Sequence, residues 1–77
     1  MIAQKLYVLM TIKHMNIQQL HEQSNISRPT ISSLLNGHSK QISFHTIEAL
    51  CRTLGVAPDV LFSEPTNEEL KLLRYSL

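Results

Sequence analysis

The sequence predicts an all-α fold: a compact bundle of about five short helices, followed by a C-terminal helical tail. Three observations lead to this fold class. Apolar residues recur every three or four positions in successive segments, residues that cap or end helices bound each segment, and the sequence contains neither an alternating strand pattern nor an internal repeat. The chain of 77 residues suffices for one modest core, and we divide it into a domain of residues 1–63 and a tail of residues 64–77.

The first helix is predicted from apolar spacing near the N-terminus, and its end is expected near His14 or Met15. A second helix is expected to begin at Ile17, because Asn16 can act as N-cap and Gln19 completes a capping box. The apolar stripe of the first helix consists of Ile2, Leu6, Leu9 and Met10, and the inner face of the second consists of Ile17, Leu20 and Ser24.

A short turn and a third helix follow. Asn25 tolerates the left-handed backbone conformation that a tight turn requires, and the apolar Ile26 is expected to point inward and hold the turn. Ser27 is a favourable N-cap, and Pro29 fits the first turn of a helix, where a missing backbone donor is harmless. These signals predict a third helix from residue 28 to about residue 36.

The remaining segments predict a fourth helix, a short turn and the tail helix. Gly37 ends the third helix and Gly55 ends the fourth, which Ser43 caps. Thr66 and Glu69 have the spacing of another capping box, which begins the tail helix. The apolar positions are Ile47, Leu50, Cys51 and Leu54 in the fourth helix, Leu61 in the turn that Pro58 opens, and Leu70, Leu73 and Leu77 in the tail.

The net charge of +1 is unevenly distributed along the chain. Residues 1–58 hold five basic and two acidic residues, a net charge of +3, whereas residues 59–77 hold two basic and four acidic residues, a net charge of −2. A polyanionic partner is therefore expected to contact the first part and to avoid the tail.

The composition argues against several other classes of protein. The sequence has no run of eighteen apolar residues and no export signal, so we expect no membrane contact and a cytoplasmic location. Cys51 is the only cysteine and lies on an apolar stripe, which predicts an inert buried thiol in a reducing compartment. Since the sequence shows no catalytic constellation, phosphate loop or short-spaced histidine pair, we expect no enzyme, cofactor, metal site or small-molecule substrate.

Two short helices joined by a turn of about three residues are the arrangement of a helix-turn-helix, which presents its second helix to the major groove of DNA. The residues extend this similarity in several segments that occur in order. These segments are NIQQL at 16–20, NISRPTISSLLNG at 25–37, ISFHTIEALCRTLGV at 42–56 and PDVLF at 58–62. Over about residues 5 to 62, the chain resembles the Cro and phage-repressor family, also called XRE-like.

The resemblance implies a lambda-repressor-like domain of five helices that binds double-stranded DNA, usually as a homodimer on a palindromic operator. It also implies a transcriptional regulator, repressor-like and of prophage or bacterial type. The third helix would read base edges, where an arginine can donate two hydrogen bonds to guanine and a serine hydroxyl can pair with several bases. The implied recognition positions are Arg28, Pro29, Thr30, Ser32 and Ser33, the phosphate-facing positions are Ser27, Asn36, His38 and Lys40, and Gln18 replaces the family's glutamine at the start of the second helix.

The chain departs from the family pattern at three places. His21 stands where the family usually has a small alanine, so either the two helices cross differently or the imidazole points outward. Ile17 stands where a glutamine commonly opens the second helix. Met10 and Leu35 replace a charged pair that links the first helix to the end of the third in many relatives. These departures affect individual contacts more than the fold.

Two alternatives stay open. The same fold serves protein-interaction modules of the antitoxin or anti-regulator type, but such a module needs a large apolar surface, whereas the predicted third helix is small and polar. The tail stripe needs a cover, because a helix this short is not stable alone. It either contacts a second copy in a homodimer or folds back on its own domain, against the first helix.

Overall fold

The computed structural model describes residues 2–38 and 41–76, with residues 74–76 described by their backbone only. The described residues form six helices and no strand, which confirms the predicted all-α bundle of five helices with a helical tail. Leu77, the last position of the predicted tail stripe, lies outside the described residues. The helices are α1 (Ile2–Ile12), α2 (Ile17–Ser24), α3 (Arg28–Leu35), α4 (Phe44–Leu54), α5 (Pro58–Leu61) and α6 (Asn67–Ser76).

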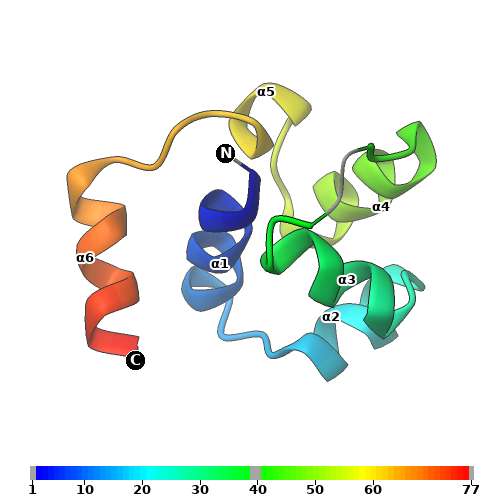
Figure 1. The fold of residues 1–77 in the computed structure, drawn as a ribbon, viewed down its shortest axis with the longest axis horizontal. Helices are drawn as coiled ribbons and strands as arrows, with labels where there is room; N and C mark the ends of the chain where they lie inside the picture. The colour runs from blue at the N-terminus through cyan, green and yellow to red at the C-terminus, as the bar shows by residue number, and fades with distance from the viewer. Residues whose placement is uncertain (1, 39–40, 77) are drawn as a thin grey trace.

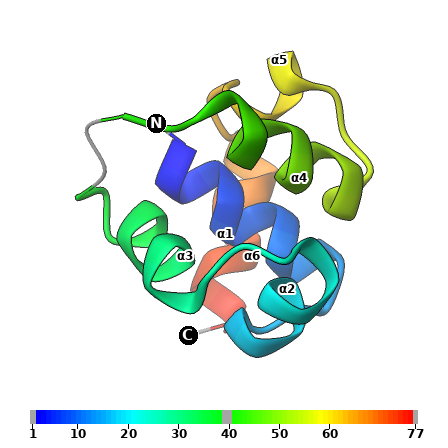
Figure 2. The same cartoon turned by 90° about the vertical axis from the view of Figure 1, so that its right-hand side faces the viewer.

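Helix α1 lies between α6 on one side and the α2–α3–α4 group on the other (Figure 1). It packs against α3, α5 and α6, while α2 packs against α3 and α4. Figure 2 shows α2 and α3 on the side of the molecule turned away from α6. The tail helix α6 and the predicted helix-turn-helix are therefore separated by the thickness of α1.

The main core lies where helices α1 to α5 meet. Met10 and Leu35, which replace the family's charged pair, are both buried within this core. Because packed apolar side chains require no desolvation of charge, this departure is compatible with the fold. Each of the five helices contributes at least one fully buried side chain, and these include Leu6, Leu20, Ile31, Leu50, Leu54 and Leu61.

Side-chain caps begin α2, α3 and α4 at the predicted residues. The Asn16 side chain accepts a hydrogen bond from the backbone N–H of Gln19 at 2.8 Å, and the Gln19 side chain accepts one from the backbone N–H of Asn16 at 2.9 Å. Ser27 and Ser43 each accept a hydrogen bond from the backbone N–H three residues later. Each cap satisfies a donor that the helix itself leaves unpaired, which stabilises the helix by about 1 kcal/mol.

Helix α1 ends at Ile12, earlier than the expected end near His14 or Met15. The backbone of His14 has a φ of 55°, in the left-handed region, where a right-handed helix cannot continue. The backbone N–H of Met15 then donates to the carbonyl of Met10 at 2.9 Å, closing a Schellman motif. Glycine is the usual residue at the left-handed position of this motif, so a histidine there gave the sequence no visible stop signal.

We expect the substitution His14→Gly to stabilise the domain by about 0.5–1 kcal/mol, because glycine adopts the left-handed conformation without a steric penalty. The gain is net of the extra freedom that glycine gives the unfolded chain. Thermal unfolding followed by circular dichroism measures it, and His14→Ala, which keeps a Cβ at this φ, is the matched control. If His14→Gly melts no higher than His14→Ala, the left-handed backbone does not strain this position.

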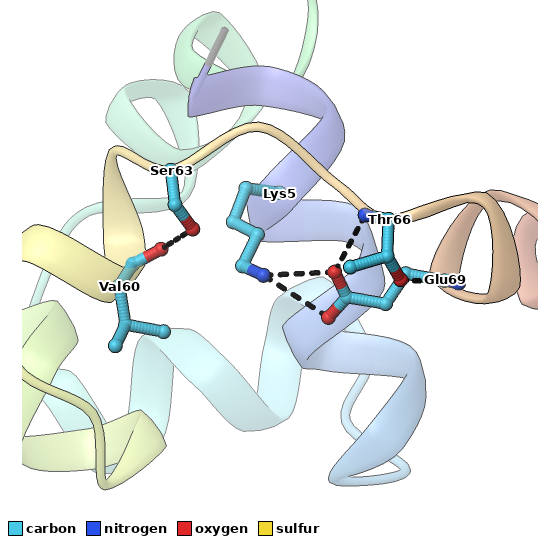
Figure 3. A network of polar contacts seen from close by, with 5 residues as sticks. All are labelled: Lys5, Val60, Ser63, Thr66 and Glu69. Atoms are coloured by element: carbon cyan, nitrogen blue, oxygen red, sulfur yellow. Dashed lines mark hydrogen bonds and ion pairs between the residues drawn. The ribbon is translucent and has the colours of Figure 1, made fainter.

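Helix α6 folds back on α1 and is fastened to it by one carboxylate (Figure 3). The ammonium of Lys5 on α1 donates to both carboxylate oxygens of Glu69, at 2.9 and 3.0 Å. The same carboxylate accepts from the backbone N–H of Thr66 at 2.9 Å, and the Thr66 hydroxyl accepts from the backbone N–H of Glu69 at 3.1 Å. The predicted capping box is therefore present, and the residue that completes it also docks the helix.

Apolar packing accompanies this ion pair. Val8 follows Lys5 by about one helical turn and is fully buried, although it lies outside the main core cluster. Leu70 and Leu73, two members of the predicted tail stripe, are half-buried on α6. Because α6 packs against α1, these two residues lie on a helix that folds back on its own domain. A contact between α6 and a second copy stays a prediction.

Candidate nucleic-acid interface

A three-residue turn joins α2 to α3 and has the predicted backbone. Asn25 has a φ of 63°, and its N–H donates to the carbonyl of His21 at 2.9 Å. Ile26 is buried, as expected, and its N–H donates to the hydroxyl of Ser24 at 3.1 Å. The Ser24 hydroxyl in turn donates to a backbone carbonyl of α2, so this buried side chain is fully satisfied. The turn is fixed by side chains of α2 as well as by its own backbone.

The imidazole of His21 also contacts this turn. Its Nδ1 lies 2.6 Å from the carbonyl oxygen of Ile26. Because a carbonyl oxygen can only accept, Nδ1 is the protonated nitrogen in this contact. The sequence predicted either a changed helix crossing or an outward imidazole, and neither expectation included this contact with the turn. The half-buried ring instead ties α2 to the start of the segment that leads into α3.

Helix α3 has an apolar inner face and a small, polar outer face. Ile31, Leu34 and Leu35 are buried against the core. The outer face carries the predicted recognition residues at helical spacing: Pro29 is exposed, and Ser32 and Ser33 are partly exposed. Small side chains on this face leave room for the helix backbone to approach another molecule closely.

The large apolar side chains that are exposed in the described part of the chain lie on other elements. A protein-docking surface on α3 would need such side chains at its centre, so the composition of this face favours a polar partner. The exposed large apolar residues are Tyr7, Ile12, Phe44, Val60, Phe62 and Leu72.

Arg28 and Gln18 are brought together at the junction of α2 and α3. The Nη1 atom of Arg28 donates to Oε1 of Gln18 at 2.7 Å, and both side chains are exposed. Gln18 also donates from Nε2 to a carboxylate oxygen of Glu22 at 2.7 Å. The structure therefore adds Glu22 to the two predicted residues, and its spacing of four residues from Gln18 on one helix was the available signal.

Ser27 and Thr30 are engaged in the cap of α3. The Ser27 hydroxyl accepts from the backbone N–H of Thr30 at 3.3 Å, and the two side-chain oxygens lie 2.8 Å apart. Thr30 is only partly exposed, whereas Ser27 is exposed at the helix start. Their hydroxyls thus have a structural role that accompanies any contact with a ligand.

Helix α3 ends in a tight turn that carries further predicted residues. Gly37 has a φ of 71°, and the backbone N–H of His38 donates to the carbonyl of Ser33 at 3.0 Å, which forms a Schellman motif. Asn36 and His38 are exposed around this turn. Lys40, the remaining predicted phosphate-facing residue, lies outside the described residues.

Cys51 was predicted to be an inert buried thiol, and it is only partly buried, packed against the core. Burial, and secondly the carboxylate of Asp59, raise the pKa of the Cys51 thiol above its ordinary value, which lowers the fraction of reactive thiolate.

Within residues 2–38 and 41–76, no three His, Cys, Asp or Glu side chains gather as a metal-binding group. No helix in this part of the chain has the length and apolar character needed to span a bilayer.

Comparison with known proteins agrees with this geometry. A family model described as the Cro/C1-type HTH DNA-binding domain matches residues 5–63, which include the helix-turn-helix and leave α6 outside. The uncharacterized HTH-type transcriptional regulator YozG of Bacillus subtilis (strain 168) is 29% identical over 62 residues, which cover 80% of this chain and 74% of that protein. No solved structure matches the chain. The chain belongs to the family of Cro/C1-type helix-turn-helix DNA-binding domains.

Proposed function

We propose that the chain is a repressor-like transcriptional regulator that binds double-stranded DNA sequence-specifically, with α3 in the major groove. The outer face of α3 carries this proposal, because it combines small polar side chains with an arginine held at its first turn. Family membership supports DNA binding. The similarity to YozG, a protein named as a transcriptional regulator, supports a regulatory role.

In this proposal the N-terminal turn of α3 leads into the groove and reads base edges. Arg28 uses one N–H of its guanidinium for Gln18, so other N–H groups of the fork can donate as a pair to O6 and N7 of a guanine. The hydroxyls of Ser32 and Ser33 pair with neighbouring bases, and Pro29 contacts a thymine methyl group.

Phosphate contacts fix the register of the helix on the duplex. They come from the backbone amides at the starts of α2 and α3, where the helix dipole favours an anion. Helix α6 lies on the side away from α2 and α3 (Figure 2), and the two acidic residues of its first turn, Glu68 and Glu69, support an orientation with α6 facing solvent. The proposed phosphate-facing side chains are Ser27, Asn36, His38 and Lys40.

We also propose that two copies bind one operator, because helix-turn-helix proteins commonly read two half-sites about one DNA turn, roughly 34 Å, apart. Selection of bound sequences from a random duplex pool tests function and symmetry together. An enriched palindrome is expected. Enrichment of a single half-site would overturn the dimer alone, and no enrichment of any sequence would overturn sequence-specific binding.

The affinity for the selected duplex is expected to fall steeply with salt. If each half-site neutralises on the order of three phosphates, a plot of log K against log salt concentration for the dimer has a slope of about −5. Fluorescence anisotropy titrations between roughly 50 and 200 mM salt measure this slope. An affinity that stays constant over that range contradicts the proposed phosphate contacts.

The substitution Arg28→Ala is expected to relax base preference at one position of each half-site, at a cost of about 1–3 kcal/mol against the preferred base. Lys40→Ala is the contrasting variant, because losing a phosphate contact weakens binding to all sequences and reduces the salt slope by about one. Competition binding against duplexes that differ at single positions measures both effects. If the base preference of Arg28→Ala is unchanged, Arg28 does not read a base, and base recognition would be assigned to Ser32 and Ser33.

A further inference from the structure

We infer that Glu22 is a positioning residue for base recognition, which orients the Gln18 amide so that this amide holds the Arg28 guanidinium in place. The inference rests on the proposed role of Arg28 in the major groove. It adds a residue of α2 that acts through other side chains and makes no DNA contact itself. Neither the family match nor the sequence resemblance assigned a role to this position.

Three exposed side chains form a chain of hydrogen bonds across the junction of α2 and α3. Gln18 donates from Nε2 to Oε1 of Glu22 at 2.7 Å, and Arg28 donates from Nη1 to Oε1 of Gln18 at 2.7 Å. Each bond joins the amide to a charged group, and short distances are typical of such bonds. The amide of Gln18 is therefore bound at both of its ends.

The two ends of a glutamine amide are not equivalent, since the oxygen only accepts and the nitrogen only donates. The ionised carboxylate of Glu22 can only accept, so it selects the orientation in which the amide nitrogen faces Glu22 and the oxygen faces Arg28. In the reversed orientation, two acceptors would face each other at Glu22 and two donors at Arg28. Glu22 thereby excludes the orientation of Gln18 that leaves the guanidinium without its partner.

Glu22 has the opposite effect on general affinity for DNA. Its exposed carboxylate lies within two hydrogen bonds of the proposed base-reading arginine, and a negative charge near phosphates weakens binding to every sequence alike. Because Glu22 helps to hold Arg28 in one geometry before DNA binds, the arginine side chain loses less conformational entropy on binding. The side chain therefore lowers affinity while raising discrimination, and these two effects can be measured separately.

Three variants separate the hydrogen bond from the charge. Glu22→Ala removes both, and we expect it to lower the preference for the Arg28-dependent base pair about three- to tenfold, while affinity for a non-specific duplex rises. Glu22→Gln keeps an acceptor oxygen at the same reach but loses the charge, so it should retain most of the preference and still bind all duplexes more tightly. Glu48→Ala removes an exposed carboxylate from α4 and should leave the base preference unchanged.

A double-mutant cycle tests whether Glu22 acts through the amide. In a Gln18→Ala background, the substitution Glu22→Ala should cause no further loss of preference, because the group that it positions is gone. If Glu22→Ala keeps the full preference while Arg28→Ala abolishes it, the positioning role is overturned and the proposed function stands. If Arg28→Ala itself leaves the preference unchanged, the reading role of Arg28 fails and this inference fails with it.

Discussion

Truncation after Ser63 is expected to lower the thermal midpoint of the domain by roughly 10–20 °C, corresponding to a loss of about 2–3 kcal/mol in the free energy of unfolding. Removing α6 exposes the face of α1 against which it packs, and it deletes the ion-pair partner of Lys5, whose side chain is buried. It also removes the half-buried Leu70 and Leu73 from the cover of that surface. The core of α1 to α5 stays intact, so the truncated chain should fold at lower temperature.

Circular dichroism melting and sedimentation of the full and truncated chains measure this outcome. Because α6 packs within its own chain, we expect the melting temperature to change while the oligomeric state on the operator does not. A truncated chain that melts like the full chain but loses its dimeric state would instead assign α6 to a contact between two copies. That result would favour the dimer alternative for the tail over the fold-back arrangement.

The elements of the fold were predictable because their signals are local. Asn16, Ser27 and Ser43 cap helices through the backbone three residues away, and Gly55 ends a helix in the left-handed conformation. Such interactions need no knowledge of the rest of the molecule. His14 shows the limit of this reasoning. It occupies the left-handed position that glycine usually takes, so the sequence carried no stop signal there and the end of α1 was predicted too late in the chain.

Contacts between helices were harder to predict from the sequence. Apolar periodicity shows that one face of a helix must be buried, but it does not show which other helix packs against that face. Lys5 illustrates this limit. It contributed to the positive charge of residues 1–58 as if it faced a polyanion, yet its ammonium is buried in an ion pair with Glu69, 64 positions later in the chain. The charge that residues 1–58 present to DNA is therefore smaller than the sequence count. In the same way, the spacing of Gln18 and Glu22 was visible, but their connection to Arg28 depends on how α2 meets α3.

Among the polar side chains of the tail helix, the largest effect of a single substitution on stability is expected at Glu69. Its side chain is 20% exposed and that of Lys5 is 7% exposed, so Glu69→Ala leaves an ammonium largely buried without its partner and also removes half of the capping box of α6. Breaking a fully buried pair costs about 3–5 kcal/mol, and the partial exposure of Glu69 reduces our expectation to about 1–2 kcal/mol, which is less than the loss expected when the whole of α6 is removed. The melting temperature at neutral pH measures this loss.

The pH dependence of stability provides a second signature of the same residue. The backbone N–H of Thr66, and then the hydrogen bond and charge of Lys5, lower the pKa of Glu69 below its ordinary value of 4.5. The unfolded chain therefore binds the proton more tightly, and the stability from this group is fully present above about pH 4.5. It is lost as the pH falls through the lower pKa of the folded state. Glu69→Gln should accordingly show a smaller drop in melting temperature on acidification than the unchanged chain.

Matched variants separate the ion pair from the cap and from general surface charge. Glu68→Ala removes the neighbouring exposed carboxylate and should change stability by no more than about 0.5 kcal/mol. Lys5→Met keeps the capping box and replaces the buried ammonium with an apolar side chain, so we expect it to destabilise the domain less than Glu69→Ala does. If Glu69→Ala melts at the same temperature as Glu68→Ala, the carboxylate does not fasten α6, and the docking of this helix rests on Leu70 and Leu73 alone.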